Sequence, residues 1–177
     1  NDRFITLINL VDIDKYLAGV VESESGPNAR PEYYKAQAVL ARTYALKHID
    51  RHSPEGFSLC DGVHCQAYKG KSVYNPEILK AVYETTGLIV ADQNYHLITA
   101  VFHSNSGGET QRSSDVWITG QPYLQAVVDP YSIGQPHARW QDTISFSKWK
   151  TYLLDNGMKS VGKLPEELLF VEQMHRK

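Results

Sequence analysis

Glu22 and Glu24 are the first residues in this sequence whose type and spacing could do chemistry. They lie in the stretch 22–27 (ESESGP), directly after the apolar run 16–21. A carboxylic acid can protonate a leaving oxygen when its pKa is raised toward neutrality, and adjacent apolar packing favours the uncharged form. On an extended segment, side chains two residues apart share a face, so both carboxylates are expected to point the same way. The alternative is that both are solvated, or that one caps a helix.

Cys60, His64 and Cys65 bring three possible metal ligands close together in the sequence. Two thiolates and an imidazole within six residues can bind zinc, which favours sulfur and nitrogen donors in a tetrahedron. His52 is the first candidate for a fourth ligand and His48 the second. Four protein ligands would make the site structural rather than catalytic. A local disulfide between the two cysteines, which suits an exported protein, and two free thiols are the alternatives.

The polar sequence HSNSGG at 103–108 is a third candidate. Small hydroxyl residues beside paired glycines allow the backbone to come close to a ligand, so the segment is either a binding loop or a plain turn. His103 and Ser104 could serve as base and nucleophile only with an orienting acid. No G-x-S-x-G pattern surrounds Ser104 or Ser106, so a serine nucleophile is not expected.

Trp117 follows Asp115 in a polar stretch, where its ring could stack on a sugar or fill the core. Lys35 and Arg42 are seven residues apart in a helical pattern and therefore share a face. That face could meet a carboxylate or a polar substrate, although such a pair is commonly a solvated surface.

Helical and strand patterns alternate along the chain and predict the elements that hold these groups. Pro31 and Glu32 begin a long Ala-rich helix that is expected to extend to about residue 50. Shorter helices are expected at 15–20, 75–86 and 147–154, with a last turn from 165, and strands at 4–10, 88–91, 96–103, 123–128, 138–144 and 168–174. The fold predicted is α+β: a single domain over 1–177 in which the long helix packs on antiparallel strands, with a possible small lobe.

The composition bounds the class of protein. The 177 residues, 42% of them apolar, are enough for one domain with a real core. A net charge of −2 provides no strong attraction to nucleic acid or anionic lipid, so neither is expected as a partner. No run approaches the roughly 20 apolar residues that span a bilayer, and no signal peptide is present. The sequence begins at Asn1 in what looks like the middle of a domain, which allows for a targeting segment outside it.

Several of these segments together resemble the catalytic domain of the stage II sporulation protein D family and the related amidase enhancers. The match covers about 14–154 and runs in order through 16–24, 35–44, 60–68, 81–87, 102–108, 115–117, 122–124 and 136–140. The resemblance implies lytic cleavage of peptidoglycan glycan strands, preferably strands without stem peptides, to leave anhydro-muramic ends. It also implies an extracytoplasmic location: secreted, periplasmic or membrane-anchored through a segment outside this sequence.

The resemblance assigns the acid/base role to Glu24, which matches the family's glutamate after the apolar run. The family often has Glu-Met-Pro there, whereas this chain has ESGP at 24–27, which leaves room for Glu22 to share the site. A lytic transglycosylase needs one carboxyl group and no cofactor for its chemistry, because the C6 hydroxyl of muramic acid attacks the anomeric carbon. Ordinary glycosidases use two carboxyl groups. The Cys60, His64 and Cys65 group is similar to a zinc site in some members.

Other residues are predicted to hold glycan hydroxyls or orient the acid/base: Glu22, Lys35, Arg42, His103, Ser104, Ser106, Asp115 and Trp117. Two other functions stay open. One is a non-catalytic module that binds glycan and stimulates a cell-wall amidase. The other is a zinc-dependent hydrolase built on Cys60, His64 and Cys65, whose metal would need an open coordination position.

Overall fold

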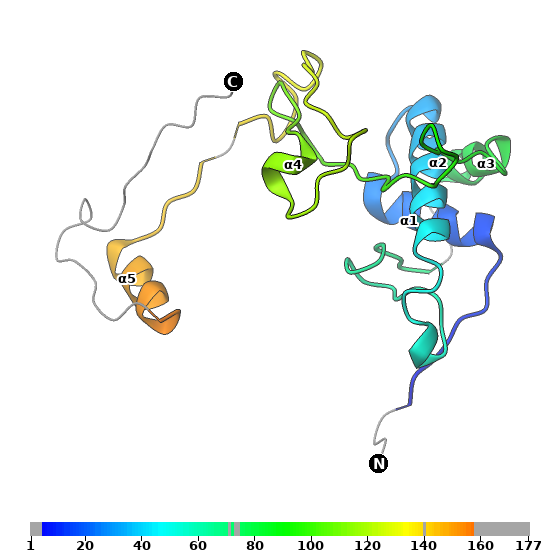
Figure 1. The fold of residues 1–177 in the computed structure, drawn as a ribbon, viewed down its shortest axis with the longest axis horizontal. Coiled ribbons are helices and arrows are strands. Elements are labelled where there is room, and N and C mark those ends of the chain that lie inside the picture. The colour runs from blue at the N-terminus through cyan, green and yellow to red at the C-terminus, as the bar shows by residue number, and fades with distance from the viewer. Residues whose placement is uncertain (1–4, 71, 73–74, 140, 158–177) are drawn as a thin grey trace.

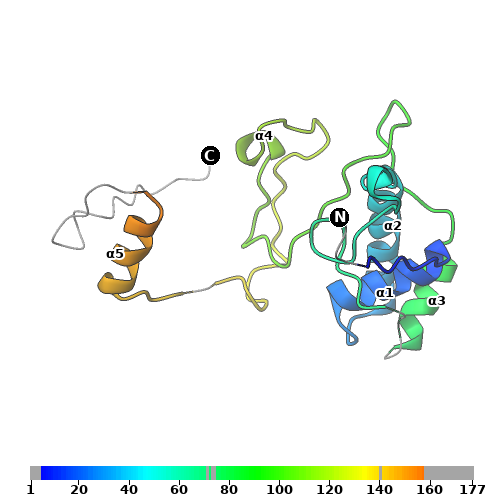
Figure 2. The same cartoon turned by 90° about the horizontal axis from the view of Figure 1, so that it is seen from below.

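The computed structural model describes residues 5–70, 72, 75–139 and 141–157. Its elements are α1 (Ile13–Ser25), α2 (Pro31–Lys47), a 3-10 helix (Ser53–Glu55), α3 (Pro76–Glu84), α4 (Ser113–Val116) and α5 (Phe146–Asp155). The first three α-helices pack against one another, whereas α4 and α5 lie apart from them in both views (Figure 1, Figure 2). No helix in these ranges is long and apolar enough to cross a membrane.

The core lies where α1, α2 and α3 meet. Its buried apolar side chains come from all three helices and include Leu17, Val20, Val21, Tyr34, Ala38, Ala41, Ile78, Ala81 and Val82. The alanines of α2 take little space, so the neighbouring helices can pack close to it. Removing this apolar surface from water is the main favourable contribution to the fold.

The predicted helices are confirmed, with different ends. As expected, α2 begins at Pro31, but it is 17 residues long and ends at Lys47, before the predicted end near residue 50. The Asn75 side chain caps α3 by accepting the N–H of Glu77 at 2.9 Å, and Ser145 caps α5 in the same manner. Proline after the cap and short polar caps are therefore reliable signals of helix starts in this chain.

The first helix is longer than predicted, and this changes the direction of the two glutamates. The Asp12 carboxylate caps α1 by accepting two N–H groups of its first turn at 3.0 and 3.4 Å. The helix then continues through Ser25 to Gly26, which has a φ of 67°. Glu22 and Glu24 are thus two residues apart on a helix instead of an extended segment, and such positions do not face each other.

A buried ion pair connects α1 and α2 to the chain around the end of α3. Nη2 of Arg42 lies 2.8 Å from Oδ1 of Asp14, and Thr86 donates its hydroxyl to Oδ2 at 2.7 Å. Arg42 also donates to three backbone carbonyl oxygens within 82–88. Burial raises the pKa of Asp14, but the hydrogen bonds from Arg42 and Thr86 lower it to a net value below the ordinary one.

The prediction of a long helix packed on antiparallel strands is wrong, because the described residues form no β-sheet. Pairing is limited to two isolated antiparallel bridges, Ala91 with Leu97 and Glu109 with Val128. Of the strands predicted at 88–91 and 96–103, only the first bridge is present, and there the Asp92 side chain closes the turn by accepting two backbone N–H groups. The predicted strands at 123–128 and 138–144 form no ladder in this part of the structure.

The segment predicted as a strand at the N-terminus shows why the strand predictions were wrong. Residues 5–10 form no strand and pair with no other described segment, and Ile5, Leu7 and Leu10 are each more than nine-tenths exposed. β-branched and apolar residues favour an extended backbone, while a sheet also requires a partner strand. The first residue of the strand predicted at 4–10, the turn from 165 and the strand at 168–174 lie outside the described residues, as does residue 140 in the strand predicted at 138–144.

Candidate functional site

Glu24 lies in the last turn of α1 with its side chain exposed. Its Oε1 accepts the N–H of Ala67 at 3.0 Å. Oε2 has no hydrogen-bond partner within the described ranges, so one carboxylate oxygen is held by backbone and the other is open. The Glu22 carboxylate binds a different segment, because its Oε1 accepts the N–H of Asn75 at 3.2 Å.

The segment that holds Glu24 lies against α1 because a glycine leaves room for it. A Cβ at Gly19 would collide with the carbonyl oxygen of Gly70, so only glycine allows 65–70 to come this close. One turn later, the Ser23 hydroxyl donates to the Gly19 carbonyl at 2.8 Å and accepts the N–H of Lys69 at 3.3 Å. The close contact at Gly19 and the hydrogen bonds of Ser23 hold the C-terminal half of α1 against the loop at 65–70.

His52, Cys60, His64 and Cys65, here called the Cys/His cluster, are brought together by the loop after α2. Their ligand atoms all lie within 4.8 Å of one another. Nδ1 of His64 is 3.7 Å from Sγ of Cys60 and 3.8 Å from Sγ of Cys65. Both cysteines are free thiols. The sequence prediction named these four residues as one group, and the fold places them as one.

The donor set of the Cys/His cluster fits zinc. A tetrahedral site with two sulfurs and two nitrogens has ligand-to-ligand distances of roughly 3.5 Å, so a small contraction would close it. Nε2 of His52 is buried without a hydrogen-bond partner in the described part of the chain. Nδ1 of the same ring is 3.4 Å from a carboxylate oxygen of Glu55, an arrangement that orients metal-binding histidines.

His48, the second candidate for the fourth ligand, is not part of the Cys/His cluster. Its ring packs on Tyr44 with centroids 4.4 Å apart, and its Nδ1 lies 3.1 Å from Nη2 of Arg51. Arg51 also donates to the carbonyl oxygen of His64 at 2.6 Å and reaches Sγ of Cys65 at 4.0 Å. A cation is therefore fixed beside the thiols.

The two thiols of the Cys/His cluster differ in acidity. Burial raises the pKa of Cys60, but hydrogen bonds with His64 and Cys65 bring it down to about 7. Burial raises the pKa of Cys65. The cluster therefore carries one thiolate readily near neutral pH, and a metal ion would have to displace the second proton.

The HSNSGG loop is fastened to a later turn through Ser106. Its hydroxyl donates to Oδ2 of Asp129 at 2.8 Å and lies 2.7 Å from the Ser132 hydroxyl. The hydrogen bond from Ser106 lowers the pKa of Asp129. His103 and Ser104 are exposed, and the structure shows no side-chain hydrogen bond for either within its described ranges. Ser106 is thus engaged by the fold, while His103 and Ser104 are available to a ligand.

Because Ser106 is hydrogen-bonded within the fold and Ser104 is exposed, mutation of each serine to alanine is expected to have a different effect. If Ser104 holds a glycan hydroxyl, as the sequence predicts, Ser104→Ala weakens the binding of soluble glycan by about threefold to tenfold at an unchanged Tm, because one hydrogen bond contributes about 0.5–1.5 kcal/mol. Ser106→Ala is expected to lower Tm first, because it removes the bonds to Asp129 and Ser132. Calorimetric titration and thermal unfolding measure the two effects. Unchanged binding and turnover for Ser104→Ala would exclude Ser104 from the site.

The remaining predicted substrate-binding residues are scattered. Lys35 forms surface ion pairs with glutamates of α2 and α3 at 2.9 and 3.0 Å. Arg42 is only 3% exposed and is used in the ion pair with Asp14, so it is not accessible to a ligand. Asp115 is exposed in α4. Trp117, the first residue after the end of α4, is 39% exposed. No described hydrogen bond joins α4 to Glu24, and α4 lies apart from α1 (Figure 1).

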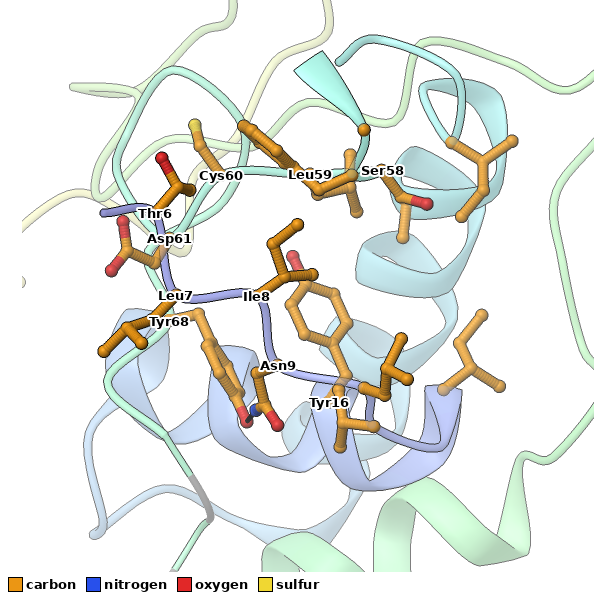
Figure 3. A pocket seen from close by; sticks show the side chains of 17 residues that line it. Thr6, Leu7, Ile8, Asn9, Tyr16, Ser58, Leu59, Cys60, Asp61 and Tyr68 are labelled. Carbon is orange, nitrogen blue, oxygen red and sulfur yellow. Dashed lines mark hydrogen bonds between the residues drawn. The ribbon is translucent and has the colours of Figure 1, made fainter. Parts of the chain in front are cut away.

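A cavity of about 540 Å³ lies between the N-terminal segment and the helices. Figure 3 shows Ile8 and Asn9 among the residues that line it, together with the rings of Tyr16 and Tyr68. Asn9 donates its side-chain N–H to the Tyr68 hydroxyl at 3.4 Å. Glu24 does not line this cavity, so the cavity is separate from that carboxylate.

Sequence reasoning missed the residues that fix the loop beside Glu24. Gln66 and Tyr16 are nearly buried and bond to each other, yet neither received a role. The available signal was a glutamine next to Cys65 in the stretch CQAY. Its partners come from distant helices, which no local pattern identifies.

Comparison with known proteins places this chain in a family. A family model described as stage II sporulation protein matches residues 1–91. The chain is 30% identical to stage II sporulation protein D of Bacillus subtilis over 175 residues, which covers 89% of this chain and 50% of that protein. It is 35% identical to the amidase enhancer of Bacillus subtilis over 139 residues, 78% of this chain and 18% of that protein.

A third relative, stage II sporulation protein D of Bacillus amyloliquefaciens, is 33% identical over 141 residues, 71% of this chain and 41% of that protein. The chain spans about half the length of these relatives, or less. The family match extends over more than half of the chain and contains both Glu24 and the Cys/His cluster. The chain belongs to the stage II sporulation protein D family.

Proposed function

We propose that this chain is a lytic transglycosylase that cleaves peptidoglycan glycan strands with Glu24 as its single acid/base. The observation that carries the proposal is the state of the Glu24 carboxylate. One oxygen is fixed by the N–H of Ala67 at 3.0 Å, and the exposed side chain leaves the other free to exchange a proton with a ligand. Glu22 is turned to another loop, so the proposal does not use a second carboxylate.

A single carboxyl group is sufficient for this reaction. Protonated Glu24 donates its proton to the glycosidic oxygen as the bond from that oxygen to the anomeric carbon breaks. The resulting carboxylate takes the proton of the C6 hydroxyl of muramic acid while that oxygen bonds to the anomeric carbon. The product has a 1,6-anhydro ring, water is not consumed, and Glu24 ends in its protonated form.

The proposed substrate is a glycan strand without stem peptides, and the proposed location is outside the cytoplasm. A second candidate function is a non-catalytic module that binds glycan and stimulates a cell-wall amidase. One relative carries the name amidase enhancer, which favours a cell-wall amidase as a partner. Both functions would use the same exposed end of α1.

The test is mass spectrometry of denuded glycan strands after incubation with the purified chain. New anhydro-muramic ends are the expected product. Strands that bind without new ends, together with faster cleavage by an added cell-wall amidase, would replace the proposal by the second function. Strands with intact stem peptides serve as the comparison substrate.

We also propose that the Cys/His cluster holds a structural zinc ion. His52, Cys60, His64 and Cys65 would supply all four ligands, so the ion would stabilise the loop that leads to Ala67 and take no part in proton transfer. This assignment is supported by the donor types, their spacing and the unpartnered Nε2 of His52.

Removal of zinc is therefore expected to destabilise the protein before it changes the chemistry. Chelation should lower Tm by about 10 °C or more, because a structural zinc site contributes several kcal/mol and each 1 kcal/mol shifts Tm by about 2–8 °C. Metal analysis and thermal unfolding with and without chelator measure this, and Cys60→Ser is the control that should no longer respond. Activity lost at an unchanged Tm would favour the zinc-dependent hydrolase. A Cys60–Cys65 disulfide in protein that is purified without chelator and contains no metal would contradict the zinc assignment.

A further inference from the structure

Gln66 connects the loop beside Glu24 to two helices of the core. Its side chain is only 7% exposed. Nε2 donates to the backbone carbonyl of Ala41 in α2 at 3.2 Å, and Oε1 accepts the hydroxyl of Tyr16 in α1 at 3.2 Å. A single buried amide thus bridges two helices that themselves pack together.

The chemistry of these partners allows only one orientation of the amide. The carbonyl of Ala41 can only accept, so the NH₂ group of Gln66 has to face it. This leaves Oε1 for the hydroxyl of Tyr16, which must donate. Burial raises the pKa of Tyr16 far above its usual range, so the hydroxyl keeps its proton at every physiological pH.

The peptide unit that follows Gln66 is the one that holds Glu24. Its carbonyl belongs to Gln66 and its N–H belongs to Ala67, and the planar peptide bond transmits the position of one to the other. That N–H lies 3.0 Å from Oε1 of Glu24. A displacement at Gln66 would therefore move the donor that fixes the carboxylate.

The geometry assigns Gln66 the role of a positioning residue for Glu24, acting through the N–H of Ala67. This inference rests on the proposed function, because it matters for cleavage only if Glu24 is the acid/base. Gln66 is not among the four residues of the Cys/His cluster but directly follows Cys65, so the metal content has to be measured together with kcat.

The test replaces Gln66 by Met, which keeps the length and loses both hydrogen bonds. The matched control is Gln37→Met, because Gln37 is also 7% exposed, lies on α2 and bonds to Tyr33 instead of the loop. For Gln66→Met, kcat on soluble glycan is expected to fall about tenfold to a hundredfold with KM changed less than about twofold, since misplacing a reacting group by about 1 Å can cost this much. The metal content should be unchanged, and Gln37→Met should retain its kcat.

Hydrogen exchange at the amide of Ala67, measured by NMR, gives a second readout that does not depend on turnover. It is expected to accelerate in Gln66→Met and to stay as in the wild type in Gln37→Met. Tyr16→Phe, which removes one of the two bonds and keeps the ring, should give an intermediate effect and serves if Gln66→Met does not fold.

Two results would overturn the positioning role: equal losses of kcat in both Met variants, or an unchanged exchange rate at Ala67. Absence of cleavage by the wild type would overturn the proposed function instead. The exchange measurement would still decide whether Gln66 holds the Glu24 contact, so the two failures are distinguishable.

Discussion

Glu24→Gln is expected to abolish the formation of anhydro-muramic ends while the protein remains folded. An amide cannot deliver a proton to the glycosidic oxygen or remove one from the C6 hydroxyl, and a positioned acid/base accelerates such steps by about 10²–10⁴-fold. The rate should therefore fall by at least about a hundredfold. The amide oxygen of Gln can still accept the N–H of Ala67, so the loop should keep its place.

The matched control is Glu22→Gln, which makes the same change on the same helix two residues earlier. Its carboxylate bonds to Asn75, so this variant is expected to keep its rate within about tenfold of the wild type. Mass spectrometry of glycan ends and thermal unfolding measure both variants. An equal loss in Glu22→Gln would return Glu22 to the site, and full activity in Glu24→Gln would remove the acid/base assignment.

The length of α1 shows a feature that local sequence signals could not predict, namely where this helix ends. The stretch ESES contains two serines, which are moderate helix formers, and the glycine and proline after them end any helical pattern. The helix continues to Ser25 because Glu22, Ser23 and Glu24 each accept an N–H from the chain between 67 and 75. These are long-range contacts, and the prediction from sequence placed the end too early because it lacked them.

The strand predictions were wrong for a related reason. The N-terminal segment at 5–10 has the apolar residues of a buried strand, but it forms no strand in the structure. What sequence pattern cannot provide is the partner, and no described strand pairs with it. Helices complete their hydrogen bonds within themselves, whereas a strand depends on another part of the chain.

The candidate site was predictable where its members are close in sequence. The Cys/His cluster came from spacing alone, and the structure brings its ligand atoms within 4.8 Å. Arg42 was expected to share an accessible face with Lys35, and the helical spacing was sound. Only the tertiary fold reveals that Asp14 of α1 covers the Arg42 end of that face, while Lys35 stays at the surface.

Arg42→Met is therefore expected to act on stability, lowering the free energy of unfolding by about 3–5 kcal/mol, because it leaves the Asp14 carboxylate buried without its cation. Urea unfolding at neutral pH measures the effect. Lys35→Met, which removes a cation from the surface of the same helix, is the control and should have little effect.

The pH dependence identifies Asp14 as the cause of this loss. In the wild type the pKa of Asp14 is lowered below 3.8, so its contribution is present above that value and is lost as pH falls through the folded pKa. In Arg42→Met only Thr86 still favours the carboxylate, and burial opposes it, so the variant should be least stable above pH 5 and lose less than the wild type on acidification. The difference between the two proteins is thus expected to shrink as pH falls toward 3. A difference that stays constant over this range would show that lost packing, and not an unpaired Asp14, causes the destabilisation.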